Sequence, residues 1–189
     1  MVAGLALAVK AGGGLLLLGL AGAVLIWAYT GPPLRLGERG TAEVIAALAW
    51  WLVVLGADFV QRHHFFMIPA VDAASFALLV AAITLAQRAV PINPAAAPKP
   101  QWHLVLGAAY AALVLLAYGW LAGGVALLYQ PHQALWGMVS LPVSLAAAGL
   151  LWRTAQQPQC ALLAWRLTVA AVLLHGLSMA GGLITVSMV

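Results

Sequence analysis

Residues 102–128 read WHLVLGAAYAALVLLAYGWLAGGVALL, a run of 27 residues without a single Asp, Glu, Lys or Arg. A helix that crosses about 30 Å of hydrocarbon needs about 20 predominantly apolar residues. Apolar and polar residues do not alternate with a period of two here or elsewhere in the chain, as they would in a transmembrane β-strand. The run therefore predicts a transmembrane helix.

Stretches of the same kind fill the rest of the chain. Of its 189 residues, 65% are hydrophobic and 6% are charged, with a mean hydropathy of +1.05. A soluble domain carries about 25% charged residues, so lipid is the solvent that this composition suits. The sequence predicts an all-α polytopic bundle, a single transmembrane domain over residues 1–189. Its expected spans are approximately 5–29, 41–61, 65–87, 102–128, 134–152 and 162–184.

The charged residues indicate how the chain is oriented in the membrane rather than which ligand it binds. The net charge of +4 comes from basic residues placed singly between apolar runs, which argues against nucleic-acid binding. Lys10 follows the first apolar stretch, so we expect an uncleaved first span rather than a signal peptide. The loops after the first, third and fifth spans hold most of the basic residues. The positive-inside rule then predicts a bacterial inner-membrane protein with both termini on the non-cytoplasmic side.

Residues 28–61, AYTGPPLRLGERGTAEVIAALAWWLVVLGADFVQ, carry a family resemblance. They resemble the UbiA superfamily of intramembrane prenyltransferases, in the branch that prenylates 1,4-dihydroxy-2-naphthoate. The last span, LTVAAVLLHGLSMAGGLI at 167–184, also looks like the final helix of that family. The positions that match the pattern are Tyr29, Thr30, Gly31, Pro33, Leu36, Gly37, Arg39, Gly40, Glu43, Gly56 and Gln61.

The chain departs from that family where the catalytic carboxylates should lie. The resemblance implies about nine helices, and this chain begins where the fourth would, without the first Asp-rich motif. QRAVPINPAAAPKPQWHLVLG, residues 87–107, replaces the second motif, and no acid follows Asp72. Mg²⁺, which would neutralise a prenyl diphosphate, needs carboxylate oxygens. Asp58 and Asp72 are expected near the face opposite Glu38 and Glu43, so the chain alone should not be a prenyltransferase and should hold no metal.

Four residues are candidates for contact with a quinone, lipid or pigment: Tyr29, Arg39, Asp72 and His175. An ionisable residue such as Asp72 is costly at membrane depth and usually functional. Alternatively, Asp72 pairs with Arg62 near the interface, in competition with an i,i+4 pair between Asp58 and Arg62. His175 could ligate a pigment magnesium or haem iron, or bind a quinone carbonyl. Its alternative is a hydrogen bond to a neighbouring helix.

These observations favour a non-catalytic accessory subunit of a larger photosynthetic or respiratory membrane complex, one that holds or gates a quinone, isoprenoid or lipid. One alternative is half of a split prenyltransferase. Another is a subunit that binds bacteriochlorophyll or carotenoid through His175. The first span has glycines at 4, 12, 13, 14, 19 and 22, which permit close approach of another helix. It is therefore the expected docking face for other membrane-protein subunits.

Overall fold

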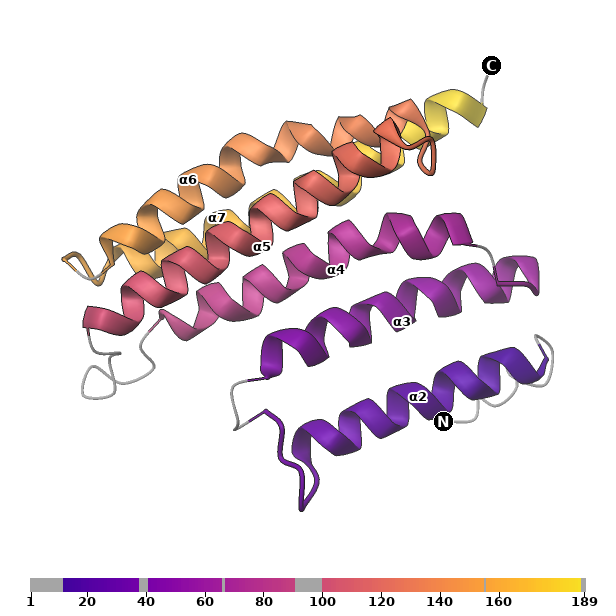
Figure 1. The fold of residues 1–189 in the computed structure, drawn as a ribbon, viewed down its shortest axis with the longest axis horizontal. Coiled ribbons are helices and arrows are strands. Elements are labelled where there is room, and N and C mark those ends of the chain that lie inside the picture. The colour runs from indigo at the N-terminus through magenta and orange to yellow at the C-terminus, as the bar shows by residue number, and fades with distance from the viewer. Residues whose placement is uncertain (1–11, 38–40, 66, 91–99, 155, 188–189) are drawn as a thin grey trace.

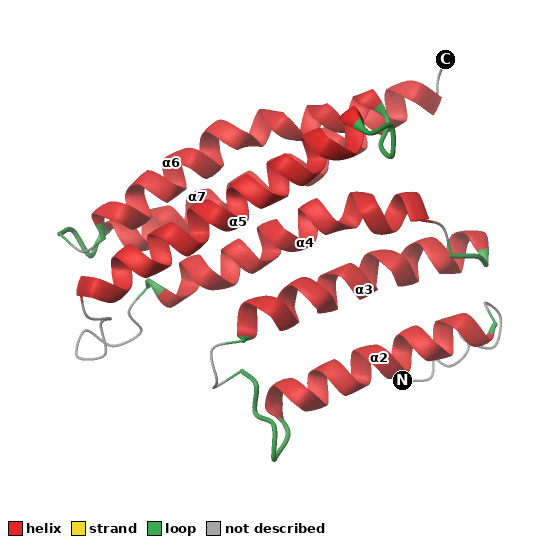
Figure 2. Ribbon diagram, in the orientation of Figure 1, coloured by secondary structure: helices red, strands yellow, loops and turns green. Residues whose placement is uncertain are grey.

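A computed structural model describes residues 12–37, 41–65, 67–90, 100–154 and 156–187. The described residues are 84% helical and contain no strand (Figure 2). Six helical segments of the described chain are long and apolar enough to cross a membrane, which confirms the predicted all-α polytopic bundle. In chain order the elements are α2 (Gly13–Thr30), α3 (Ala42–Arg62), α4 (Met67–Arg88), α5 (Pro100–Ala126), η2 (His132–Ser140), α6 (Leu141–Arg153) and α7 (Cys160–Ser187).

The helices lie roughly side by side along one common direction. Helix α2 lies at one edge of the bundle (Figure 1). The elements α4, α5, η2, α6 and α7 contact one another around the main cluster of buried side chains. Helix α3 packs on α4, and α2 packs on α3. The core is built from small residues, such as Ala82, Ala86 and Ala117, which let helix backbones approach closely where no water drives association.

The predicted span at 134–152 is two elements rather than one helix. Residues His132–Ser140 form a 3₁₀ helix, and an α-helix begins at Leu141 with Pro142 in its first turn. Proline has no N–H and its ring clashes with the carbonyl four residues earlier, so an α-helix through this point is disfavoured. His132–Arg153 is nevertheless long and apolar enough to cross a membrane, as the predicted span requires, and only the helix type changes within it.

Elsewhere the observed helices match the predicted spans within a few residues. The last span is the longest, with α7 running from Cys160 to Ser187. The predicted start of the first span, and Lys10 within it, lie outside the described residues. Helix α3 has an acidic residue, Glu43, in its first turn and Arg62 in its last, which suits the helix dipole at both ends.

Candidate functional site

Tyr29 lies near the C-terminal end of α2, where the chain folds back on the helix. The N–H groups of Leu36 and Gly37 donate hydrogen bonds to the carbonyls of Ala28 and Tyr29, at 3.0 and 3.2 Å. A Cβ at position 37 would lie 2.7 Å from the Tyr29 ring, so the ring rests on the glycine. Arg39, the second candidate in this region, lies outside the described residues.

Tyr29 borders an apolar cavity of about 270 Å³ between α2, α3 and α4. Its size is close to the lower limit for small-molecule pockets. Thr84 contributes a hydroxyl, but that group already bonds to the Ala81 carbonyl at 2.8 Å. Apart from Tyr29 and Thr84 the cavity lining is aliphatic, so it offers few groups to orient a polar head. Its remaining residues are Leu25, Ile26, Ala42, Ile45, Ala46 and Ala49.

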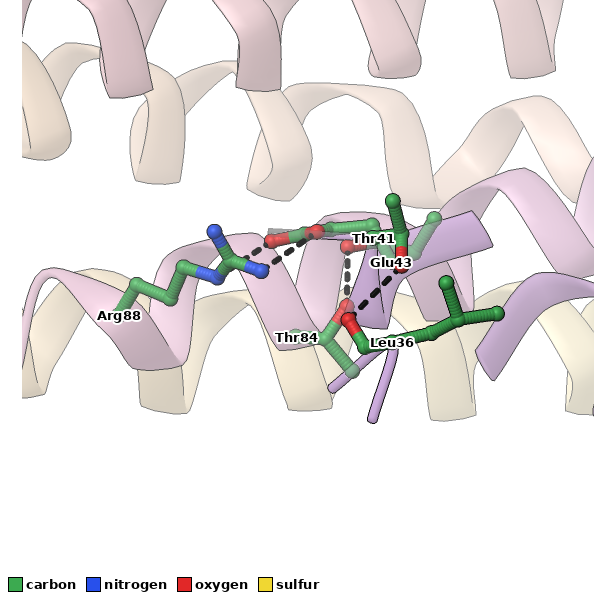
Figure 3. Close-up of polar contacts among 6 residues, drawn as sticks. Leu36, Thr41, Glu43, Thr84 and Arg88 are labelled. Carbon is green, nitrogen blue, oxygen red and sulfur yellow. Dashed lines mark hydrogen bonds and ion pairs between the residues drawn. The ribbon is translucent and has the colours of Figure 1, made fainter. Parts of the chain in front are cut away.

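An ion pair that the sequence did not reveal joins the start of α3 to the end of α4 (Figure 3). Arg88 Nε lies 2.7 Å from Glu43 Oε1, and Arg88 Nη2 donates to Glu43 Oε2 at 2.9 Å. The Glu43 side chain is 13% exposed and that of Arg88 is 37% exposed. This geometry is bidentate, the stronger form of an arginine–carboxylate contact. The Glu43 carboxylate therefore links α3 to α4.

Asp72 lies at the opposite end of the bundle, near the start of α4. Arg62 forms its ion pair with Asp58, at 2.9 Å, which is the i,i+4 alternative that the sequence allowed. Among the described residues, no lysine or arginine forms an ion pair with Asp72. Its polar neighbour is the side chain of Gln130, from the turn after α5. Even so, Asp72 Oδ1 and both polar atoms of the Gln130 amide are buried without a well-formed hydrogen bond within the described chain.

A larger cavity of about 500 Å³ lies beside this pair, along the outer face of α5. Trp120 at its edge donates from Nε1 to the Val71 carbonyl at 2.9 Å, which links α5 to α4. Gln130 is 4% exposed, and its Oε1 lies 2.6 Å from where a Cβ on Gly124 would be. Gly124 also lines the cavity, whereas Asp72 and Gln130 are not among its described lining residues. The other lining residues are Leu115, Leu116, Gly119, Gly123, Leu127 and Tyr129.

His175 is fully buried at the centre of the α5, η2, α6 and α7 packing. Its Nδ1 lies 3.1 Å from the Gly137 carbonyl and 3.3 Å from Ser140 Oγ. The Tyr118 hydroxyl bonds to Ser140 Oγ at 2.7 Å and to Ser144 Oγ at 3.0 Å. The hydrogen bond to a neighbouring helix, which the sequence allowed as the alternative for His175, is therefore present.

The second imidazole nitrogen of His175, Nε2, has no hydrogen-bond partner in the described part of the chain. A neutral imidazole that donates from Nδ1 to the Gly137 carbonyl leaves Nε2 as an acceptor. The rings of Phe76 and Tyr118 lie 6.1 and 5.6 Å from the imidazole, centre to centre. A pigment or haem macrocycle could reach Nε2 only if these packed side chains moved. The surroundings of His175 fit a packing role better than axial ligation.

The candidate residues thus fall into three separate places. Tyr29 lies at the end of the bundle that holds Glu43 and Arg88, Asp72 lies at the other end, and His175 lies within the core. Gln130 and Trp120 were not predicted as site residues. Gln130 lies in an expected turn, where a polar residue is ordinary, and Trp120 lies in an apolar span, where a tryptophan is expected near the membrane interface. The chain finds no match among protein-family models, curated proteins or solved structures.

Proposed function

We propose that this chain is a non-catalytic subunit of a larger membrane complex, and that α2 packs against a transmembrane helix of a partner subunit. The observation that carries the proposal is the position of α2. Of its described side chains, only Ala28 is buried, whereas α4 to α7 share an extensive core. Among the described elements α2 packs on α3, and no other described helix packs closely on its far side.

The outer face of α2 has the residue pattern of a helix–helix interface. Gly19 and Ala23 are both exposed and four residues apart, so they lie on one face. Small residues at this spacing let two transmembrane helices approach closely. A Cβ at position 19 would meet nothing within 4 Å, so space for a partner is open there. Glycine destabilises a helix by about 1 kcal/mol relative to alanine, a cost that lipid contact alone would not offset.

Another glycine of α2 serves the internal packing. A Cβ at Gly14 would overlap the Phe59 ring of α3, so Gly14 supports the α2–α3 contact. We therefore assign the proposed docking face to Gly19 and Ala23 and not to Gly14.

The distribution of charge supports a non-catalytic role and an orientation. Glu43 is paired with Arg88 at one end of the bundle, and the two aspartates lie at the other. This separation fits our proposal that the chain is a UbiA-like protein without a carboxylate cage for Mg²⁺. The C-terminal ends of α2, α4 and α6 lie at the same end of the bundle (Figure 1), and Arg35 follows α2 while Arg88 and Arg153 are the last residues of α4 and α6. The positive-inside rule assigns that end to the cytoplasm of a bacterial inner membrane, with both termini outside.

Gly19→Leu should reduce co-purification of the partner subunit from native membranes in mild detergent by about tenfold or more. The added side chain would occupy the space that the partner helix needs. The measurement is quantitative mass spectrometry of the proteins that co-purify with a tagged chain. Gly149→Leu is the matched control, because Gly149 is exposed on α6 and a Cβ there also meets nothing within 4 Å.

Both variants should insert into the membrane as the native chain does. The proposal fails if Gly19→Leu retains the same co-purifying subunits as Gly149→Leu. It also fails if the native chain runs as a free monomer in mild detergent.

A further inference from the structure

We infer that the end of the α6–α7 pair that carries Arg153 and Arg166 binds the headgroup of one anionic phospholipid. Arg153 is the last residue of α6, and Arg166 lies in the second turn of α7. Helices α6 and α7 pack against each other in opposite directions, so both arginines belong to the same end of the bundle (Figure 1). The inference does not depend on the proposed partner subunit, because that subunit would dock on α2.

Neither arginine has a counter-charge within the part of the chain that the structure describes. Both are exposed, and no side-chain hydrogen bond or ion pair joins either guanidinium to a described residue. No Asp or Glu follows Asp72 in the sequence, so α5, η2, α6 and α7 carry no side-chain carboxylate. Glu43, at the same end of the bundle, already contacts Arg88 at 2.7 and 2.9 Å. The described chain therefore leaves both positive charges for another molecule to neutralise.

Arg166 lies within the apolar part of α7 and not at its end. The membrane-crossing segment of α7 begins at Cys160, six residues earlier, which is about 9 Å along the helix at 1.5 Å per residue. Ala164 and Thr168 are buried, so Arg166, two residues from each, points away from the core and toward lipid. A charge at this depth is costly, and a long arginine side chain lowers the cost by extending to the interface. The phosphates of lipid headgroups lie at that level.

The backbone that carries Arg153 is held at the level of the interface. Trp152 is 49% exposed, and a Cβ on Gly107 of α5 would lie 3.7 Å from the Trp152 Cα. The Thr154 hydroxyl bonds to Nδ1 of His103 at 2.9 Å, which joins the end of α6 to the first turn of α5. Exposed tryptophans at the ends of membrane spans lie among lipid headgroups. The Arg153 guanidinium is therefore within reach of a lipid phosphate.

The chemistry of this end favours an anionic phospholipid over other sources of negative charge. A guanidinium group presents a planar set of N–H donors that fits phosphate oxygens. Leu173 and Leu177 follow Arg166 along the same side of α7 and are 62% and 72% exposed, which suits contact with acyl chains. The ammonium group of a zwitterionic phospholipid cancels its net attraction to two positive charges. A protein carboxylate would have to be brought to the edge of the bilayer at a cost, whereas phosphates are already there.

The test is native mass spectrometry of the purified, delipidated chain, with phosphatidylglycerol and phosphatidylcholine of identical acyl chains in competition. We expect the native chain to prefer the anionic lipid by about 25-fold, since each arginine near a lipid headgroup contributes a factor of about five. Arg153→Gln and Arg166→Gln should each reduce the preference by about fivefold. The double variant should lose most of it.

Three controls separate this site from general effects of charge and fold. Arg153→Lys and Arg166→Lys keep the charge and should retain most of the preference. Arg35→Gln removes an exposed positive charge that follows α2, across the bundle from α6 and α7, and should bind as the native chain does (Figure 1). Inorganic phosphate in excess should not displace the lipid, because it makes no contact with Leu173 and Leu177. All these arginines are exposed, so the variants should keep the native thermal denaturation midpoint.

Equal binding of the two lipids by the native chain would overturn the inference and leave both arginines to a carboxylate of a protein partner. It is also overturned if the double variant keeps the native preference, or if Arg35→Gln lowers the preference as much as Arg166→Gln does. Displacement by inorganic phosphate would contradict it as well, because the site would then bind a free anion. These measurements use the purified chain alone, so their failure is distinct from that of the docking proposal for α2.

Discussion

Gly137→Val should destabilise the bundle more than any other single substitution that we consider. Gly137 is buried in η2 against α7, and a Cβ there would lie 2.8 Å from Cε1 of His175 and 3.1 Å from a Leu121 methyl. Overpacking a filled core costs about 1–3 kcal/mol, and this site would also lose the bond between His175 and the Gly137 carbonyl. We expect a loss of about 3 kcal/mol, measured as a lower thermal denaturation midpoint in detergent.

Gly181→Val is the matched control for this substitution. Gly181 is exposed on α7, and a Cβ at this position meets nothing within 4 Å. Its midpoint should stay near that of the native chain. Equal midpoints for Gly137→Val and Gly181→Val would contradict the close packing of η2 on α7.

Arg88→Met should cost about 2 kcal/mol, because it leaves the largely buried Glu43 carboxylate without its counter-charge. Removing one partner of a buried ion pair is worse than removing both, since the second change also removes the unpaired charge. The double variant Glu43→Gln/Arg88→Met should therefore be more stable than Arg88→Met alone. Thermal denaturation of Arg88→Met, Glu43→Gln, the double variant and the native chain completes the double-mutant cycle.

A second arginine provides the comparison for that cycle. Arg62→Met breaks a pair within one helix, with Asp58. The Arg62 side chain is 56% exposed, and the Asp58 side chain is 13% exposed, as is that of Glu43, so the two arginine variants differ mainly in whether the pair links two helices. Pairs of this kind contribute about 0.2–0.5 kcal/mol. If Arg62→Met destabilises the chain as much as Arg88→Met does, the Glu43–Arg88 contact does not hold α3 and α4 together.

The helical spans could be predicted from sequence because each follows from a local property, the length of an uncharged run. Pro142 was visible within the fifth span, but the close packing of Gly137 of η2 against His175 of α7 was not. That contact joins residues far apart in the chain. The pair between Glu43 and Arg88 was hidden for the same reason, since 45 residues separate its members.

The candidate site was predictable only in part. Asp72 and His175 stood out because polar groups are rare in apolar spans. Gln130 did not, because a polar residue in a turn is ordinary, and its burial depends on how that turn folds onto Gly124. Which glycines of the first span face the rest of the bundle could not be predicted from sequence either. Helix packing separates Gly14, which faces Phe59, from the outward-facing Gly19.

The most direct measurement for the proposed subunit role is site-specific photo-crosslinking in native membranes. A photoreactive side chain at position 19, and separately at position 23, should form an adduct with the same partner protein, because both positions share the outer face of α2. The same side chain at position 149, on the exposed side of α6, should crosslink to lipid. Lipid adducts alone at positions 19 and 23, or the same protein adduct from position 149, would contradict the proposal that α2 is a specific docking helix.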